Sequence, residues 1–421
     1  MTRTADDIGA LCEGIAARAA HARRQVARTT GADRRAMLID IACAIRERAG
    51  GILEANARDL EDNPDLDDAL CDRLMLDDAR VEGVACAVEQ IAEQPDPVGR
   101  VVDGRVLPNG VRLEKRRVPI GTLLVIYESR PNVTVDAAAL CLKAGNAIIL
   151  RGGKEALHSN TAFADAIRSV LAKRALADAV QLVPTTDRAA TKHLVRMNGR
   201  VDLCIPRGGP GLINAVCEAA TIPVVKHDAG NCHLYIDEHL EGMEDEAIAI
   251  AINSKAHRFG VCNAIETLLV HERALPILDK LGPLLAVKGV ELRADDRARA
   301  HLVGAKPATD EDYATEFLAP ILAIATVDSL DDACAHIARY ASGHTEAIVT
   351  ASARSAQRFQ QGVDSANVMV NCSTRFADGG EYGLGAEIGI STDKLHARGP
   401  MGAEDLTTFQ WVLTGDGQVR G

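Results

Sequence analysis

Residues 121–150 read GTLLVIYESRPNVTVDAAALCLKAGNAIIL, and this stretch decides the fold. Two nearly continuous apolar runs, 121–127 and 146–150, flank a helical stretch near 135–143. Each run has the length of a strand, and an unbroken apolar run is typical of a strand that is buried on both faces. Strands that alternate with helices predict right-handed crossovers and a parallel sheet, so the fold class is α/β.

The same alternation extends beyond this stretch. Upstream, residues 6–92 repeat apolar positions at three- and four-residue spacing, which predicts helices. A second α/β unit is predicted from about 234 to 372, and a Gly-rich loop follows at 376–389. The further strands that we expect are 180–183, 201–205, 223–225, 266–270, 319–326 and 368–371, and the further helices are 156–174, 189–197 and 212–219.

Residues 101–118 differ from both units. Two polar, alternating runs flank Leu107-Pro108-Asn109-Gly110, and Asn-Gly between such runs is the strongest short signal for a hairpin. The last apolar run, 406–413, alternates and contains β-branched and aromatic residues. We therefore expect a β-hairpin arm, to which the last run adds a strand in this chain or in a neighbouring subunit.

Composition limits the class of protein. The chain has 421 residues, 47% hydrophobic and 25% charged, with a net charge of −12 that argues against a nucleic-acid surface. Eleven scattered cysteines without a CxxC pair, and twelve histidines without ligand spacing, predict reduced thiols and no metal site. The N-terminus has no apolar signal core, and no apolar run is long enough to cross a membrane. We expect a soluble cytoplasmic protein.

One thiol has the surroundings of a nucleophile. Residues 254–264, SKAHRFGVCNA, put Cys262 two residues after Gly260 and just downstream of Lys255, His257 and Arg258. Nearby cations lower the pKa of a thiol, and the thiolate is the reactive form. Because most cysteines are small buried hydrophobes, this window alone leaves a structural role open.

Two pairs of glycines follow predicted strands. Gly152-Gly153 and Gly208-Gly209 each precede a helix, where free backbone N–H groups favour an anion. No GxGxxG or GxxxxGK[ST] motif is present, so ordinary turns stay open as an alternative. Two such turns in one parallel sheet favour a dinucleotide site.

With these features together, the chain resembles the aldehyde dehydrogenase superfamily. Within it, the gamma-glutamyl phosphate reductase family is similar nearly from end to end. The motifs that carry the resemblance are YESRPNVT (127–134), KAGN (143–146), IPRGG (205–209), GVCNA (260–264) and TRFADGGEYGLGAE (374–387), together with the stretch 333–348, from which Cys334 and Ala341 depart.

The resemblance implies a reaction and its catalytic residues. The family uses NADPH to reduce L-glutamate 5-phosphate to L-glutamate 5-semialdehyde, with release of phosphate, in proline biosynthesis. Cys262 would attack the acyl phosphate and form a thioester that accepts hydride. The backbone N–H of Cys262 and the side chain of Asn132 are the candidate oxyanion donors. Hydrolytic relatives have a Glu upstream of the Cys; here Asp228 stands near that place, and a role for it as a base stays open.

For the cofactor, the resemblance favours NADP. Where NAD-dependent relatives have Lys-Pro-Ser-Glu, this chain has Arg151-Gly152-Gly153-Lys154. The Glu would repel a 2′-phosphate, whereas Lys154 and Arg151 would attract it. Gly208 and Gly209 are further cofactor-binding candidates. Glu316 looks like the superfamily Glu that binds the nicotinamide ribose, although an exposed surface carboxylate is the alternative.

For the substrate, we expect Lys255, His257 and Arg258 to form the phosphate pocket, because charge-assisted hydrogen bonds suit a phosphate. Ser373 and Arg375 are expected near the amino-acid end of the substrate. The partners are therefore small molecules: glutamyl phosphate, glutamate semialdehyde and phosphate. Transient contact with glutamate 5-kinase is a further expectation, because glutamyl phosphate cyclises readily in water.

The predicted organisation is an aldehyde dehydrogenase-like α/β fold that forms a homo-oligomer. Residues 1–100 and 121–233 would form a Rossmann-like NADP-binding domain and 234–375 the catalytic domain. Residues 101–120 and 403–421 would form the oligomerisation arm, and 376–402 a Gly-rich return to the cofactor domain. Two alternatives stay open: another acylating aldehyde dehydrogenase that uses coenzyme A, and a non-catalytic NADP-binding scaffold.

Overall fold

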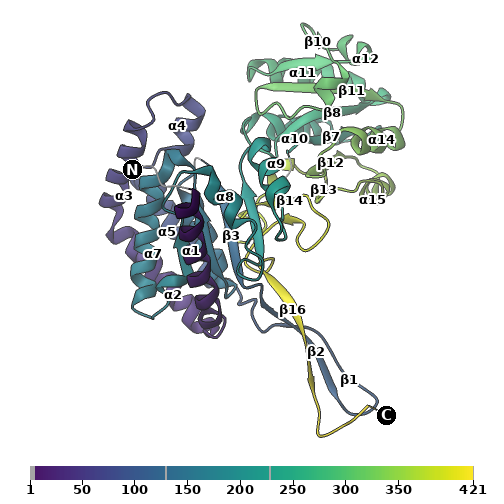
Figure 1. The fold of residues 1–421 in the computed structure, drawn as a ribbon. Helices are drawn as coiled ribbons and strands as arrows, with labels where there is room; N and C mark the ends of the chain where they lie inside the picture. The colour runs from purple at the N-terminus through teal and green to yellow at the C-terminus, as the bar shows by residue number, and fades with distance from the viewer. Residues whose placement is uncertain (1–4, 129, 227–228, 421) are drawn as a thin grey trace. The chain divides into compact units, whose positions relative to one another are not determined.

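The computed structural model of the protein describes residues 5–128, 130–226 and 229–420, which form two compact units (Figure 1). Unit 1 comprises Met1–Lys226, Gly383–Gly389 and Met401–Gly421, and unit 2 comprises His227–Tyr382 and Ile390–Pro400. The boundary thus lies after residue 226 and not after 233, and the Gly-rich segment is divided between the units. Within the described ranges, we find no helix that combines the length and the apolar character needed to span a bilayer.

A four-stranded parallel sheet forms the centre of unit 1. Its order is β5-β4-β3-β6, with β3 (Thr122–Tyr127), β4 (Ala147–Arg151), β5 (Val180–Leu182) and β6 (Leu203–Arg207). Every residue of β3 and β4 is buried, as their unbroken apolar runs predict. The predicted strand at 223–225 is wrong: only Val224 pairs, through a single bridge to Cys204.

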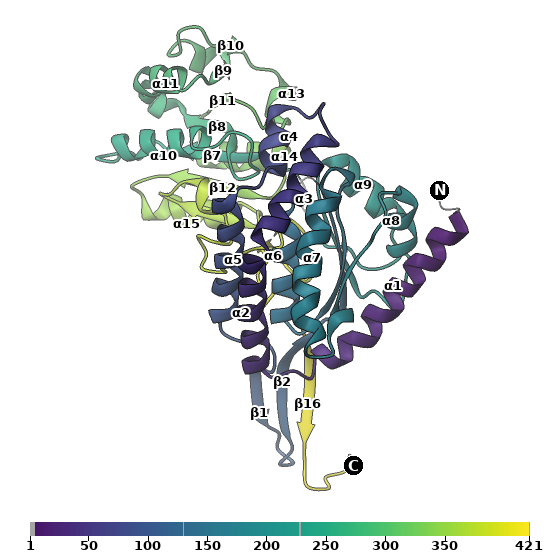
Figure 2. The ribbon, with the colours of Figure 1, turned by 90° about the vertical axis from the view of Figure 1, so that its left-hand side faces the viewer.

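Helices cover both faces of this sheet (Figure 2). On one face, residues of α1 (Ala5–Val26), α8 (Arg188–Leu194) and α9 (Pro210–Ala219) share a core with the side chains of Leu124, Ile126 and Ile149. On the other face lie α6 (Asn132–Lys143) and α7 (Leu157–Ala172). The remaining helical elements are α2 (Gly31–Glu47), α3 (Ala49–Glu61), α4 (Asp68–Leu74), α5 (Asp78–Glu93), η1 (Lys154–Ala156) and η2 (Ala177–Ala179).

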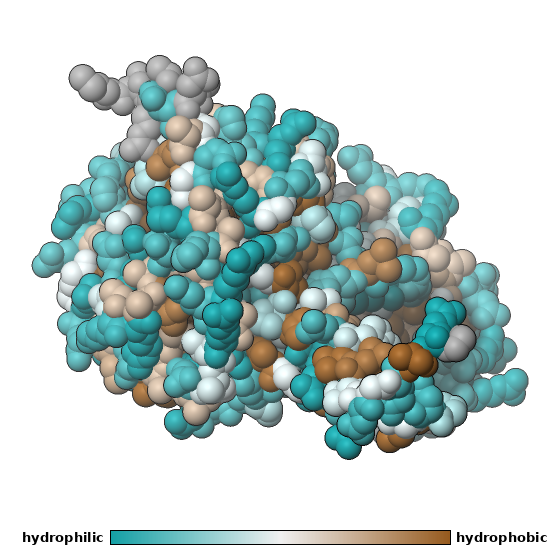
Figure 3. Space-filling model, turned by 60° about the horizontal axis from the view of Figure 1, so that its bottom comes forward, coloured by the Kyte–Doolittle hydropathy of each residue, from teal (hydrophilic) through white to brown (hydrophobic). Residues whose placement is uncertain are grey.

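The predicted hairpin is present as an arm of unit 1. It consists of β1 (Val101–Val106) and β2 (Arg112–Pro119), joined at Asn109-Gly110, where Gly110 has a φ of 86°. The last strand, β16 (Thr407–Thr414), pairs antiparallel with β2 of the same chain. Apolar side chains gather on the exposed surface seen in Figure 3. Those of the arm include Val106, 67% exposed, and Leu413, 60% exposed.

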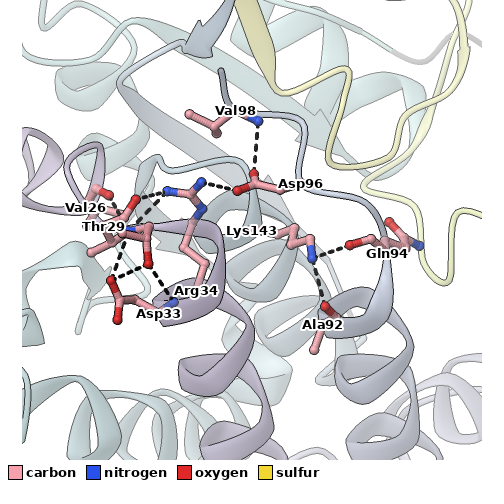
Figure 4. A network of polar contacts seen from close by, with 10 residues as sticks. Val26, Thr29, Asp33, Arg34, Ala92, Gln94, Asp96, Val98 and Lys143 are labelled. Carbon is pink, nitrogen blue, oxygen red and sulfur yellow. Dashed lines mark hydrogen bonds and ion pairs between the residues drawn. The ribbon is translucent and has the colours of Figure 1, made fainter. Parts of the chain in front are cut away.

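The turn from α6 to β4, residues 143–146, holds the chain at the root of the arm. The Lys143 ammonium donates to the carbonyls of Ala92 (2.8 Å) and Gln94 (2.6 Å) near the end of α5, beside an Arg34–Asp96 ion pair (Figure 4). The amide of the fully buried Asn146 accepts from the Gly121 N–H (2.8 Å) and donates to the Leu406 carbonyl (2.7 Å). We call residues 143–146 the root turn.

A seven-stranded parallel sheet forms the centre of unit 2. Its order is β10-β9-β11-β8-β7-β12-β13. The strands are β7 (Cys232–Ile236), β8 (Ile265–His271), β9 (Glu291–Ala294), β10 (Lys306–Pro307), β11 (Ile321–Val327), β12 (Thr345–Val349) and β13 (Asn367–Val370). Alternate residues of β7 point to opposite faces, so that Leu234 and Ile236 enter one core and Tyr235 the other.

Two sets of helices cover this second sheet. The helices α10 (Glu244–Ala256) and α11 (Leu278–Val287) share the core of Leu234, whereas α14 (Leu330–Tyr340) and α15 (Ala353–Gly362) share that of Tyr235. The short elements of the unit are α12 (Asp296–Arg299), α13 (Asp310–Tyr313), η3 (Glu272–Ile277), η4 (Thr374–Phe376), β14 (Ile390–Ser391) and β15 (Gly399–Pro400).

Candidate active site

Cys262 lies in a turn between the end of α10 and the start of β8. Its side chain is partly exposed, unlike those of Cys141, Cys204 and Cys232, which are buried. A hydrogen bond from the Ala264 N–H to the Val261 carbonyl (3.1 Å) closes the turn. The thiol therefore lies in a turn and not in a helix.

The backbone of Cys262 is fixed by the segment that leads into β7. The thiol of Cys232 donates to the Cys262 carbonyl (3.1 Å). Gly230 packs so closely on that backbone that a Cβ there would lie 1.9 Å from the Cys262 carbonyl oxygen. No residue other than glycine fits at 230 without movement of the Cys262 turn.

The segment 373–377 supports the turn from another side. The Thr374 hydroxyl donates to the Asn263 carbonyl (2.7 Å), and the Asn263 amide donates to the Ala377 carbonyl (2.9 Å). The hydroxyls of Ser373 and Ser254 are 3.1 Å apart. The buried side chain of Ser373 therefore already has a polar partner in the structure.

Three of the predicted substrate-binding cations gather at the turn. The Nε–H of Arg375 lies 3.4 Å from Nδ1 of His257. Burial lowers the pKa of Arg375, the charge of Arg258 lowers it further, and Asp378 and Cys262 oppose the shift. These interactions bring Arg375, Arg258 and Cys262 into one electrostatic neighbourhood, and the side chains of His257 and Arg258 are exposed to solvent.

Lys255 does not belong to this exposed group. Its side chain has no exposed surface, and its ammonium forms an ion pair with the equally buried Glu266. Burial lowers the pKa of Lys255 and raises that of Glu266 to about 7. The prediction that Lys255 contacts a substrate phosphate does not fit this geometry, because the ammonium is enclosed by protein.

Glu316 lies in the loop after α13 and is partly buried. One of its carboxylate oxygens accepts the Gly230 N–H at 2.7 Å. Burial raises its pKa and this hydrogen bond lowers it. The alternative of a fully exposed surface carboxylate is therefore excluded, and the role in binding a ribose stays a prediction.

In unit 1, Asn132 is the first residue of α6, and its amide donates to the Asp136 carboxylate (2.9 Å). Desolvation raises the pKa of Asp136 to about 6, although Asn132 and the charge of Arg207 oppose the shift. Sequence reasoning missed Asp136. Its spacing of four residues from Asn132 on a helix was the signal that it shares a face with Asn132.

The two predicted cations after β4 differ in exposure. Arg151 is buried, and its guanidinium donates to the carbonyls of Gly152 (3.0 Å) and Thr186 (2.9 Å). Its burial and these two hydrogen bonds do not favour the predicted contact with a 2′-phosphate, although its buried Nε–H has no partner. Lys154, at the start of η1, is exposed.

The second glycine turn lies where the strand order of unit 1 reverses, between β3 and β6. Ligands of open α/β sheets bind outside the carboxyl ends of strands at such a point. Here the Gly209 N–H donates to the Glu128 carboxylate at 3.0 Å, and a Cβ at Gly208 would lie 2.4 Å from the same oxygen. Glu128, which sequence reasoning missed, places a negative charge at one of the amides that we assigned to the cofactor.

The comparisons with known proteins agree with this architecture. Residues 3–305 and 300–387 match the family model described as the aldehyde dehydrogenase family. The chain belongs to the aldehyde dehydrogenase family. The predicted α/β fold class is thereby confirmed, and the protein is an oxidoreductase of this family.

Three similar relatives are named gamma-glutamyl phosphate reductase. The chain is 50% identical over 420 residues to a gamma-glutamyl phosphate reductase of Rhodopirellula baltica, covering 99% of this chain and 96% of that protein. It is 53% identical over 387 residues to that of Thermobifida fusca, covering 91% and 92%. The crystal structure of the gamma-glutamyl phosphate reductase of Thermotoga maritima is similar with a TM-score of 0.94 and 41% identity, covering 97% of this chain and all of that one.

Members of the aldehyde dehydrogenase family use a nicotinamide cofactor, and unit 1 fits one in part. The parallel sheet, its reversal point and the exposed ammonium of Lys154 are features that would hold a dinucleotide phosphate. The Glu128 carboxylate would repel an anion at the Gly209 N–H as long as the carboxylate keeps this position. Asp228 lies outside the described residues. Within those residues, no three His, Cys, Asp or Glu side chains converge as a metal site would require.

Proposed function

We propose that this protein reduces L-glutamate 5-phosphate to L-glutamate 5-semialdehyde and phosphate with NADPH, as a step of proline biosynthesis. The identity to three gamma-glutamyl phosphate reductases over nearly the whole chain supports this substrate. The observation that carries the proposal is a partly exposed thiol, Cys262, in a fixed turn, whose charge interacts with the Arg375 guanidinium, as does that of Arg258. Such a cluster suits a substrate in which an acyl carbon is bonded to a phosphate.

Cys262 is the nucleophile in this proposal. Its thiolate attacks the acyl carbon, a C–S bond forms, the C–O bond to phosphate breaks, and phosphate leaves with the electron pair. NADPH supplies the hydride that reduces the resulting thioester. The hemithioacetal then collapses to the aldehyde and regenerates the thiolate of Cys262. The Cys262 backbone N–H and the Asn132 amide are the proposed donors to the tetrahedral oxygen.

His257, Arg258 and Arg375 are the proposed anion-binding side chains. Two guanidinium groups and an imidazole can donate to several oxygens of a phosphate or carboxylate at once. We assign the phosphate to His257 and Arg258 and retain Ser373 with Arg375 at the amino-acid end. Lys255 is left out of this set because its ammonium is paired with Glu266.

For the cofactor we propose NADP and not NAD. The exposed ammonium of Lys154 is the group that would attract the 2′-phosphate, and Gly208, Gly209 and Glu316 are retained as further contacts. Arg151 is omitted because its guanidinium holds backbone carbonyls.

We further propose a homo-oligomer that assembles through the arm. Val106 and Leu413 are 67% and 60% exposed, and edge strands invite pairing. A cytoplasmic location is consistent with eleven cysteines and no disulfide among the described residues. Transient contact with glutamate 5-kinase would protect the labile acyl phosphate.

The acyl acceptor tests the proposed reaction. The enzyme is assayed in the oxidative direction with glutamate semialdehyde and NADP, with phosphate, with coenzyme A or with neither. We expect sustained turnover only with phosphate. Arg258→Ala should raise the KM for phosphate about tenfold, which corresponds to a loss of about 1.4 kcal/mol of binding free energy. Arg273→Ala is the matched control, since Arg273 is an exposed arginine of the same unit that pairs with Glu238.

Two other results would each favour an alternative. Turnover with coenzyme A in place of phosphate would indicate another acylating aldehyde dehydrogenase. If no acceptor supports turnover and Cys262 is alkylated no faster than the other ten thiols, with or without NADPH, the protein is a non-catalytic scaffold.

A further inference from the structure

Lys255 and Glu266 stand on either side of the Cys262 turn. Lys255 is next to the last residue of α10, and Glu266 is the second residue of β8. Their ion pair, without exposed surface on either side chain, closes the base of the loop that carries Cys262. The end of the helix and the start of the strand are thereby fixed to each other.

Glu266 also connects this base to another loop. Its second carboxylate oxygen accepts the Leu318 N–H at 3.1 Å. Leu318 has a φ of 49°, a left-handed conformation that is unfavourable for a leucine and needs support from its surroundings. Glu316 lies two residues before Leu318, so the hydrogen bond to Leu318 also constrains the backbone next to Glu316.

Glu316 is connected to the Cys262 backbone through Gly230. Its carboxylate accepts the Gly230 N–H at 2.7 Å, and Gly230 packs directly on the Cys262 carbonyl. The contacts form a closed ring: the Cys262 loop, the Lys255–Glu266 pair, the 316–318 loop, Gly230 and the Cys262 backbone. Every member of this ring belongs to unit 2.

A buried ion pair is an unusual way to hold such a loop. Removing two charges from water costs free energy, and their mutual attraction often does not offset this cost. Well-packed apolar side chains of similar volume stabilise a fold as much as such a pair or more. The raised pKa of Glu266 and the lowered pKa of Lys255 reflect this cost of burial. What apolar side chains cannot provide is the acceptor for the Leu318 N–H.

We propose that Lys255 and Glu266 are positioning residues, which set the Cys262 turn relative to the Glu316 carboxylate through the ring of contacts described above. The proposal rests on the proposed function of Cys262 as the nucleophile. It places Lys255 outside the substrate pocket. It also gives Glu266 a role that its neighbours in the sequence do not predict.

Two double variants separate positioning from stability. Lys255→Met/Glu266→Gln removes both charges and keeps an acceptor for Leu318, whereas Lys255→Met/Glu266→Met removes both charges and the acceptor. Both avoid an unpaired buried charge, so we expect both to fold. Amide hydrogen exchange is followed in peptides that cover 229–231, 258–264 and 316–320, and kcat and KM are measured in the phosphate-dependent assay.

We expect the Met/Met variant to exchange about tenfold faster or more in all three peptides, although Gly230 has no bond to Glu266. Its kcat should fall about 100-fold at a nearly unchanged KM for phosphate, as for a misplaced reacting group. The Met/Gln variant should lie between it and the wild type. Asp237→Asn, which neutralises another buried carboxylate of unit 2, bonded to Tyr235 and Thr350, is the control and should match the wild type.

If both double variants fold and keep the exchange pattern and kcat of the wild type, the pair is only a structural contact and the proposal is overturned. Faster exchange confined to 316–320 would also overturn it, because the ring predicts a response at Gly230. Hydrogen exchange needs no substrate. A wild-type enzyme without phosphate-dependent turnover would therefore refute the proposed function while the exchange data still decide the positioning of the turn.

Discussion

Three basic side chains precede Cys262, and the structure gives them different environments. His257 and Arg258 are exposed, whereas Lys255 is enclosed and paired with Glu266. The spacing in α10 explains the difference: Lys255 follows the buried Ala251 by four residues and therefore lies on the inner face of the helix. The number of charged residues near a thiol does not reveal which of them is buried. The helical spacing of the buried residues in α10 does reveal it.

Lys154 carries the proposed preference for NADP. Lys154→Glu should weaken NADPH binding about tenfold or more and leave NADH binding nearly unchanged, because only NADPH has a 2′-phosphate for the carboxylate to repel. Titration of each cofactor by its fluorescence measures both dissociation constants.

Lys173→Glu is the matched control for this change. Lys173 is exposed at the end of α7, at the opposite end of that helix from Lys154, and its replacement should alter neither dissociation constant. Equal weakening of NADH and NADPH by Lys154→Glu would show that the lysine does not read the 2′-phosphate.

At the scale of elements, the root turn connects the core of unit 1 with the arm. Asn146 bonds to Gly121 between β2 and β3 and to Leu406 just before β16. Gly145, with a φ of 77°, packs against Pro119 at the end of β2, where a Cβ would lie 2.8 Å away. A single buried amide therefore fixes the points at which two of the three arm strands leave the core.

Asn146→Ala tests the root turn. It leaves the partly buried Gly121 N–H and the buried Leu406 carbonyl without partners. An unpaired buried polar group costs about 1–3 kcal/mol, and less where water reaches it, so we expect the opening free energy of β2 and β16 to fall by about 2–4 kcal/mol. Hydrogen exchange at 112–119 and 407–414 measures it, while the sheet of unit 2 should keep its protection. Asn198→Ala, at an exposed asparagine, should change exchange by less than about 0.5 kcal/mol. Equal exchange in wild type and Asn146→Ala would contradict the role of the root turn.

Some elements were predictable from the sequence and others were not. The runs at 121–127 and 146–150 became β3 and β4 because both faces of the sheet are covered, so the strands need apolar residues throughout. The sequence did not predict the strand β9, because polar residues alternate with apolar ones over only four residues there. The pairing of β16 with β2 in its own chain depended on contacts across the sequence that a local pattern does not contain.

The candidate site was predictable to a similar degree. The thiol, the exposed cations and the glycine turns follow from local residue types. The roles of Arg151, Lys255 and Glu128 depend on their partners, which are Thr186, Glu266 and Gly209. Each partner lies in another segment of the chain, so burial and pairing decided what residue type alone did not.

At the scale of the whole molecule, the chain contains a parallel-sheet unit suited to a dinucleotide and a second α/β unit that presents Cys262. We propose that Cys262 carries the substrate as a thioester and that phosphate is the group exchanged with it.

A rapid-quench measurement of NADPH formation tests this claim most directly. With glutamate semialdehyde and NADP but no phosphate, the account predicts a burst of about one NADPH per Cys262 thiol, after which turnover stops until phosphate is added. Cys262→Ala should give no burst and no turnover. Continuous NADPH formation without phosphate, or a burst of the same size in Cys262→Ala, would contradict the account.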